Sequence, residues 1–107
     1  MNYVLLFLAG AFLCNCLPHL ISGLQGRPFP TPFAKPSGLG PSSPLVNFLW
    51  GALNLLIGLF MLANQALVIG PNPDFAALAV GFLIIGVFSA LHFAKARRLA
   101  KAARERG

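Results

Sequence analysis

Two histidines and two cysteines are the side chains of this sequence best suited to binding a haem iron or a metal ion. Imidazole nitrogens can ligate a haem iron, and thiolates bind softer transition metals. His19 and His92 could hold a haem between them, and Cys14 and Cys16 lie close enough to His19 in the chain to be considered as metal ligands with it. Two thiols that are two residues apart on a helix point in different directions, however, and no recognised zinc spacing is present. The alternative is that each histidine lies at a membrane interface and bonds to a carbonyl or a lipid headgroup.

Acid–base catalysis has few residues available. The chain contains only two acidic residues, Asp74 and Glu105, and both lie outside the apolar interior of the predicted spans. Paired carboxylates and carboxylate proton relays need acidic residues close together. We therefore expect a protein that is not an enzyme and that has no cofactor.

The elements that position these residues are predicted to be membrane-spanning helices. Hydrophobic residues make up 57% of the chain and charged residues 9%, whereas about a quarter of the residues in a soluble domain are charged. Apolar runs at about 3–24, 44–69 and 73–94 are each long enough to cross a bilayer. The sequence thus predicts an all-α membrane protein in which residues 1–107 form a single membrane domain with three transmembrane helices.

The second and third runs carry clear boundary signals. Ser43 is a predicted helix cap and Pro44 suits a first helical turn. Gly70 is a predicted helix end, and Asn72, Pro73 and Asp74 then repeat the start signal. The short link predicts that the last two helices form an antiparallel hairpin. A cleaved signal peptide is the alternative for the first run, but no Lys or Arg precedes it and no small-residue cleavage site follows it, so we expect it to be retained.

Basic residues predict the orientation. The tail at residues 95–107 is rich in Lys and Arg, and the loop at residues 25–43 carries Arg27 and Lys35. Because basic segments stay on the cytoplasmic side, we expect the loop and the C-terminus inside and the N-terminus outside a bacterial inner membrane. The tail has no aromatic residue to stack on bases, so we expect no nucleic acid as partner. Its residues that are expected to contact anionic lipids of the inner leaflet are Lys95, Arg97, Arg98, Lys101 and Arg104.

Small and polar residues follow one face of the second predicted helix. Asn47, Gly51, Asn54 and Gly58 recur at steps of four and three, and Gly86 and Ser89 form a comparable face on the third helix that could receive them. Small residues allow close helix packing and amides can bond across the gap. We expect this face to be a packing surface of the bundle, of a homo-oligomer or of a larger membrane complex. A polar substrate pathway is the alternative.

Within the loop at residues 25–43, the part from residue 27 to 36 has proline at nearly every second position, which favours extended backbone. Its aromatic residues Phe29 and Phe33, with Arg27 beside them, are unlike the composition of a disordered linker. We expect an ordered proline-rich cap with His19 beneath it. A docking site for a partner and a lid over a substrate or headgroup remain alternatives.

The first half of the chain contains a series of short motifs, in the order Asn15-x-x-Pro18-His19, Gly23-x-x-Gly26, Phe29-Pro30-Thr31-Pro32-Phe33-Ala34, Ser42-Ser43-Pro44 and Asn47-x-x-Trp50-Gly51. In these motifs the chain resembles a family of short bacterial integral membrane proteins without an assigned activity. The resemblance implies a bacterial inner-membrane protein and no particular chemistry.

Three functional hypotheses follow. The first is a non-enzymatic structural or accessory component that assembles through helix packing. The second is a pore-forming protein, since the layout resembles that of some phage holins, or a small transport protein. The third is a haem or metal carrier that uses His19 and His92.

Overall fold

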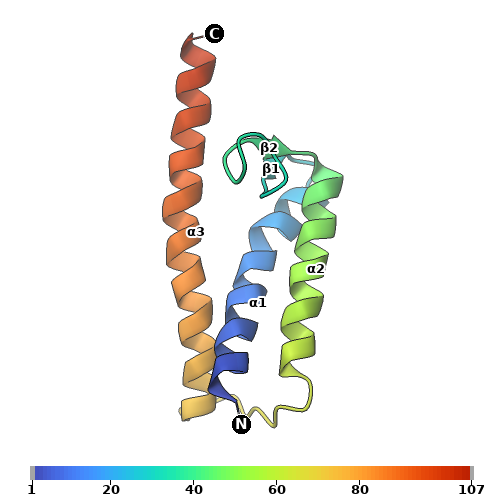
Figure 1. The fold of residues 1–107 in the computed structure, drawn as a ribbon, viewed down its shortest axis with the longest axis vertical. Helices are drawn as coiled ribbons and strands as arrows, with labels where there is room; N and C mark the ends of the chain where they lie inside the picture. Colours follow the sequence, from blue (N-terminus) through green and yellow to red (C-terminus); the bar gives the residue numbers. More distant parts are fainter. Residues whose placement is uncertain (1, 107) are drawn as a thin grey trace.

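A computed structural model describes residues 2–106 of the chain. Three helices carry the fold, and two very short strands lie between the first and the second: α1 (Tyr3–Leu24), β1 (Phe29–Pro30), β2 (Pro41–Ser42), α2 (Pro44–Leu62) and α3 (Pro73–Arg106) (Figure 1). Each helix is long and apolar enough to cross a membrane. The predicted all-α class with three such helices is confirmed.

The helix starts follow from side-chain caps. The Asn2 side chain accepts hydrogen bonds from the backbone N–H groups of Val4 (3.0 Å) and Leu5 (3.2 Å), and Ser43 accepts one from Val46 (3.2 Å). Asn72 accepts one from the N–H of Phe75 (2.9 Å) at the start of α3. Each cap satisfies backbone donors that have no partner inside the first turn.

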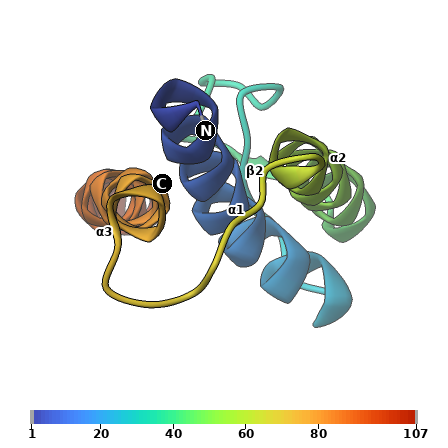
Figure 2. The same cartoon turned by 90° about the horizontal axis from the view of Figure 1, so that it is seen from below.

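The central position belongs to α1. Both α2 and α3 pack along it, on different sides, and α2 and α3 have almost no contact with each other among the residues described (Figure 2). The last two helices run in opposite directions, but they do not form the predicted hairpin of direct neighbours (Figure 1). The chain reaches α3 by passing around the end of α1, which requires a long link rather than a tight turn (Figure 2).

The second helix is shorter than predicted, because it ends at Leu62 rather than at residue 69. Ala63 takes an extended conformation (φ −58°, ψ 136°), and Asn64 has a left-handed φ of 65°. The Gln65 side chain then accepts a hydrogen bond from the N–H of Asn2 (3.3 Å), which holds the link beside the start of α1. The prediction that Gly70 ends the helix is therefore wrong, and residues 63–72 form the link.

Backbone contact joins α1 to α3. A Cβ atom added at Gly10 would overlap the carbonyl oxygen of Leu78, and one added at Gly81 would overlap the carbonyl oxygen of Phe7. Glycines at both positions thus let the two helix backbones touch, as small residues do in membrane helix pairs. Beyond this contact α3 continues without a break through the basic segment, so that the molecule measures 53 × 24 × 20 Å (Figure 1).

Candidate functional site

Asn47 lies at the centre of a polar cluster beneath the proline-rich loop. Its side chain is fully buried, and its Nδ2 donates toward the backbone carbonyls of Phe29 (2.9 Å), Ser42 (3.1 Å) and Ser43 (3.1 Å). Because carbonyl oxygens only accept hydrogen bonds, the amide atom that faces three of them must be the nitrogen. The oxygen Oδ1 therefore faces His19.

His19 is held in one tautomer by this amide. Its Nδ1 lies 2.8 Å from Asn47 Oδ1, and an amide oxygen can only accept, so Nδ1 carries the proton. The ring is 2% exposed and meets the edges or faces of three aromatic rings, those of Phe29, Trp50 and Phe93, with centroid distances of 5.5, 6.5 and 6.2 Å. In its neutral form His19 has its other nitrogen, Nε2, as a hydrogen-bond acceptor.

A second amide pair lies deeper between α1 and α2. Asn15 Nδ2 donates to Asn54 Oδ1 (3.0 Å), and Asn54 Nδ2 donates to the carbonyl of Trp50 (2.8 Å). Within the described part of the chain, every fully buried side-chain nitrogen and oxygen has a partner. The polar groups inside the bundle thus hold one another and the backbone in place.

The loop itself is folded around Thr31. Strand β1 pairs with β2 in antiparallel register, with Phe29 opposite Ser42. Thr31 is 1% exposed, its hydroxyl bonds to that of Ser42, and its carbonyl accepts from the N–H of Gly38 (2.8 Å). The segment between the strands is therefore a closed loop that lies over His19.

His92 connects this loop to α3. Its Nε2 donates to the carbonyl of Gly38 (2.6 Å), and its ring stacks on Phe88 with an interplanar angle of 10°. Gly38 has a φ of 71°, a left-handed conformation that favours glycine. The two histidines consequently approach the loop from different helices, α1 and α3.

Both histidines line one cavity of about 150 Å³, together with Asn15, Thr31 and Trp50. Pockets for drug-sized ligands measure roughly 300–1,000 Å³. A haem does not fit this space unless the loop moves away. The cavity can accommodate a few small polar atoms beside His19.

The cysteines do not join His19 in a metal site. Cys16 Sγ donates to the carbonyl of Leu13 (2.9 Å), and Cys14 lies beside Gly86, where an added Cβ would be 3.5 Å from its sulfur. Among residues 2–106 no three His, Cys, Asp or Glu side chains come together as metal ligands. Cys14, Cys16 and His19, which the sequence analysis considers together as metal ligands, thus have separate surroundings, with Cys14 beside Gly86 of α3 and His19 bonded to Asn47 of α2.

The small and polar face of α2 is buried against α1 rather than against α3. The buried residues of α2 are Asn47, Gly51, Asn54 and Gly58. A Cβ at Gly51 would lie 2.8 Å from the backbone nitrogen of Leu20, and one at Gly58 would lie 2.9 Å from the side chain of Leu13. The prediction that Gly86 and Ser89 of α3 receive this face is wrong, since Gly86 lies beside α1 and Ser89 is half-buried on α3.

The remaining sites named from the sequence lie at the basic end of the molecule. Arg27 is exposed, Phe29 is half-buried against Phe93 (centroids 4.5 Å apart), and Phe33 is 65% exposed with its ring against Trp50. The basic side chains of α3 are all exposed, and of these Arg97 and Arg104 face the loop. The exposed set comprises Arg106 and the five residues predicted to contact lipid, Lys95, Arg97, Arg98, Lys101 and Arg104.

Several residues of the cluster carry no recognisable functional motif. Asn15 and Thr31 are polar residues in apolar or proline-rich surroundings, and their polarity is the signal that could have identified them. Gly81 follows Ala77 by four residues, the small-x-x-x-small spacing of helix contacts.

Comparison of the chain with models of protein families, with characterised proteins and with solved structures found no match.

Proposed function

We propose that the protein is a non-enzymatic accessory or structural component of a bacterial inner membrane, which binds another membrane-spanning chain through helix packing. The distribution of Lys and Arg supports an orientation with the N-terminus outside and the basic end of α3 in the cytoplasm. The polar groups inside the bundle support a structural role, because they bond to one another and to the loop.

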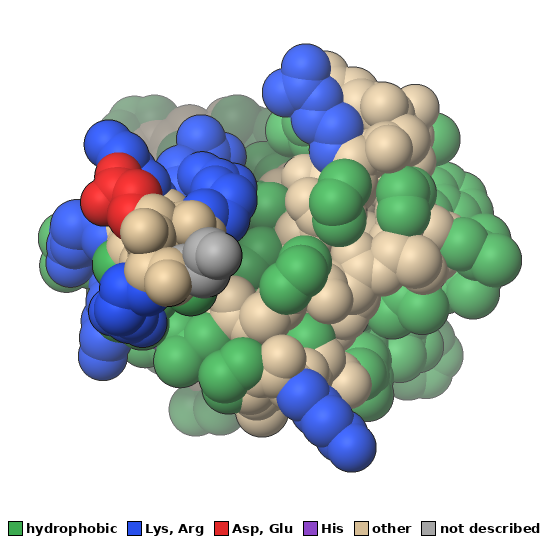
Figure 3. All heavy atoms as spheres, turned by 90° about the horizontal axis from the view of Figure 1, so that it is seen from above, with side chains coloured by type: hydrophobic (Ala, Val, Ile, Leu, Met, Phe, Trp, Pro, Cys, Tyr) green, Lys and Arg blue, Asp and Glu red, His purple; other side chains and the backbone are tan. Residues whose placement is uncertain are grey.

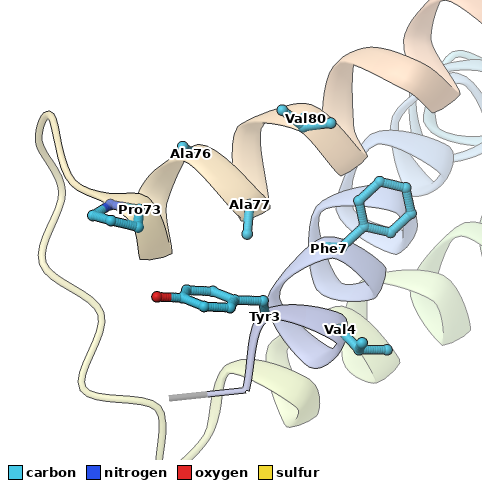
Figure 4. A pocket seen from close by; sticks show the side chains of 7 residues that line it. All are labelled: Tyr3, Val4, Phe7, Pro73, Ala76, Ala77 and Val80. Carbon is cyan, nitrogen blue, oxygen red and sulfur yellow. The ribbon is translucent and has the colours of Figure 1, made fainter.

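The observation that carries this proposal is an apolar groove of about 630 Å³ between the first turns of α1 and α3 (Figure 4). Tyr3 and Phe7 form one wall, while Ala76, Ala77 and Val80 form the other (Figure 4). The side chains of Ala76 and Ala77 are small and leave space on the α3 side of the groove. Small residues of this kind allow a further helix to approach closely. The groove therefore suits the side chains of an additional membrane-spanning helix.

We propose the groove as the contact surface in place of the face of α2 that the sequence favours for assembly. Asn47, Gly51, Asn54 and Gly58 are in contact with α1 of the same chain, so they are not free to bind a second chain. The groove at Ala76 is open, and it lies at the end of the bundle away from the loop.

Photo-crosslinking in intact membranes tests the proposal. A photoreactive residue at position 76 is expected to give a discrete crosslinked product, identified by mass spectrometry as a second copy or as another membrane protein. The matched control is position 90, an exposed alanine on the same helix that does not line the groove. Adducts with lipid alone at position 76, or equal protein products at both positions, would contradict the proposal.

Filling the groove provides a second readout. Ala76→Leu is expected to abolish the product formed by a crosslinker at Val80, while Ala90→Leu leaves it unchanged. Unchanged crosslinking of both variants would count against the groove as the contact surface.

A further inference from the structure

A second cavity, of about 270 Å³, lies at the basic end of the molecule between the proline-rich loop and α3. Phe29 and Leu39 of the loop and Phe93 of α3 make it apolar on one side. Arg97 and Arg104 of α3 also line the cavity. Between them lies Ala100, whose small side chain leaves space on this side of the cavity. An apolar cleft is thus bordered by two cationic side chains.

The two arginines face the same way. They are seven residues apart, which is close to two full turns, so they project from one face of α3 with their Cα atoms roughly 10 Å apart along the axis. Of the two acidic residues in the chain, Asp74 lies in the first turn at the opposite end of α3, and Glu105 is the immediate neighbour of Arg104, about 100° further around the helix. The positive charge at this cavity therefore greatly exceeds the negative charge.

The depth of the cavity matches a lipid headgroup. The apolar part of α3 ends near Phe93, and the first basic residue of the tail, Lys95, follows two residues later. At about 1.5 Å per residue, Arg97 lies roughly 6 Å beyond Phe93, near the boundary between hydrocarbon and headgroups, and Arg104 lies roughly 16 Å beyond Phe93, on the aqueous side of that boundary. Viewed from this end, basic side chains surround α3 and apolar side chains of the molecule lie beside them (Figure 3).

The loop wall of the cavity is held in position. His92 donates to the Gly38 carbonyl, directly before Leu39, and Phe29 packs against Phe93. A ligand at this cavity would therefore meet a surface that is already formed, which reduces the ordering cost of binding.

From these observations we propose that the cavity is a binding site for one anionic phospholipid. Its phosphate is bound by Arg97 and Arg104, since guanidinium groups match phosphate oxygens in charge and geometry. Its glycerol and upper acyl carbons lie against Phe29, Leu39 and Phe93. The site is independent of the groove at Ala76 and of the proposed assembly function, because it lies at the other end of the bundle.

Native mass spectrometry of the full chain in detergent tests the site, with phosphatidylglycerol as the probe and phosphatidylcholine as the comparison. Phosphatidylcholine is zwitterionic with no net charge, and its ammonium group is repelled by the two arginines. We expect one phosphatidylglycerol to be retained and phosphatidylcholine to bind at least about tenfold more weakly. Inorganic phosphate in millimolar excess is expected not to displace the lipid, since it lacks the apolar part. Displacement by phosphate would show a simple anion site and overturn the lipid proposal.

Two double variants with the same change in net charge separate a site from general attraction. Arg97→Gln with Arg104→Gln is expected to weaken phosphatidylglycerol binding at least about tenfold. Lys95→Gln with Arg98→Gln, which alters two residues that do not line the cavity, is expected to change binding less than about twofold. Equal losses in the two variants would overturn the proposal.

A variant that keeps every charge gives an independent check. Ala100→Phe is expected to fill the cavity and to remove the bound phosphatidylglycerol, while circular dichroism shows unchanged helix content. Full retention of the lipid by Ala100→Phe would contradict the assignment of the cavity.

Discussion

One amide side chain, that of Asn47, joins the proline-rich loop to α1 and α2. Its oxygen accepts from His19, and its nitrogen donates to carbonyls at Phe29, Ser42 and Ser43. These are the residues that bring β1, β2 and the start of α2 together. The loop is thus held by a buried side chain of α2 as well as by its own hydrogen bonds.

Asn47→Leu is expected to destabilise the protein by about 2 kcal/mol or more, because it removes the partner of His19 and the amide's bonds to the carbonyls of Phe29 and Ser42. The loop should loosen, and detergent-solubilised protein should be cut faster by chymotrypsin after Phe33 or Leu39. Leu45→Ala, at an exposed position of α2, is the control and should leave the cleavage rate unchanged. Equal protection in Asn47→Leu and wild type would show that the loop is held without this amide.

At the scale of the elements, the contact between α1 and α3 depends on the absence of a side chain at two positions. An added methyl at Gly81 would meet the carbonyl oxygen of Phe7, which cannot move without displacing the helix. At Gly86, by contrast, an added methyl would make an ordinary contact with the sulfur of Cys14 at 3.5 Å. On the same helix, therefore, Gly86 has room for an added methyl group and Gly81 does not.

Gly81→Ala is expected to lower the stability of the protein by about 1–3 kcal/mol through overpacking. Gly86→Ala should be neutral or slightly stabilising, because alanine favours the helix by roughly 0.5–1 kcal/mol over glycine. Thermal unfolding of both variants in the same detergent measures the difference. A similar unfolding temperature for the two variants would contradict the close approach at Gly81.

The sequence predicts the existence of the helices better than their arrangement. Apolar runs identify three spans because a bilayer demands apolar side chains over a fixed length. Residues 66–69 are strongly apolar, so the apolar run continues across Asn64 and Gln65 and places the end of α2 too late, whereas the helix ends at Leu62, just before the left-handed Asn64. The predicted hairpin depended on this error, because a link that starts at Gly70 is too short to pass around α1.

In the candidate site, too, the sequence predicts which residues are buried better than it predicts which elements contact them. The recurrence of Asn47, Gly51, Asn54 and Gly58 predicts a buried face, since all four are small or polar and lie on one side of a helix. The pattern of residues in α2 does not show whether α1 or α3 covers that face, because the answer depends on how well each of the two helices packs against it. His19 and His92 converge on one loop because β1 and β2 close it between the two helices, and four paired residues with two prolines give little sequence signal.

At the scale of the whole molecule, α1 occupies the space between the other two helices. Among residues 2–106, α1 runs between α2 and α3 and contacts both of them (Figure 2), an arrangement that leads us to expect no ion conduction by a single copy. We expect liposomes that contain the purified protein to retain a small fluorescent dye as well as protein-free liposomes do. Dye release that increases with the amount of protein would favour the holin-like hypothesis instead.

The central position of α1 also has a consequence for the biosynthesis of the protein. The N-terminal helix is made first, and it carries Asn15 and His19, whose partners Asn54 and Asn47 are still within the ribosome. An unsatisfied polar group in hydrocarbon costs several kcal/mol. We therefore expect α1 to remain beside the translocon until α2 arrives and then to enter the lipid together with it. Because α3 meets α1 through bare backbone at Gly10 and Gly81, it can be released last and dock onto a finished pair.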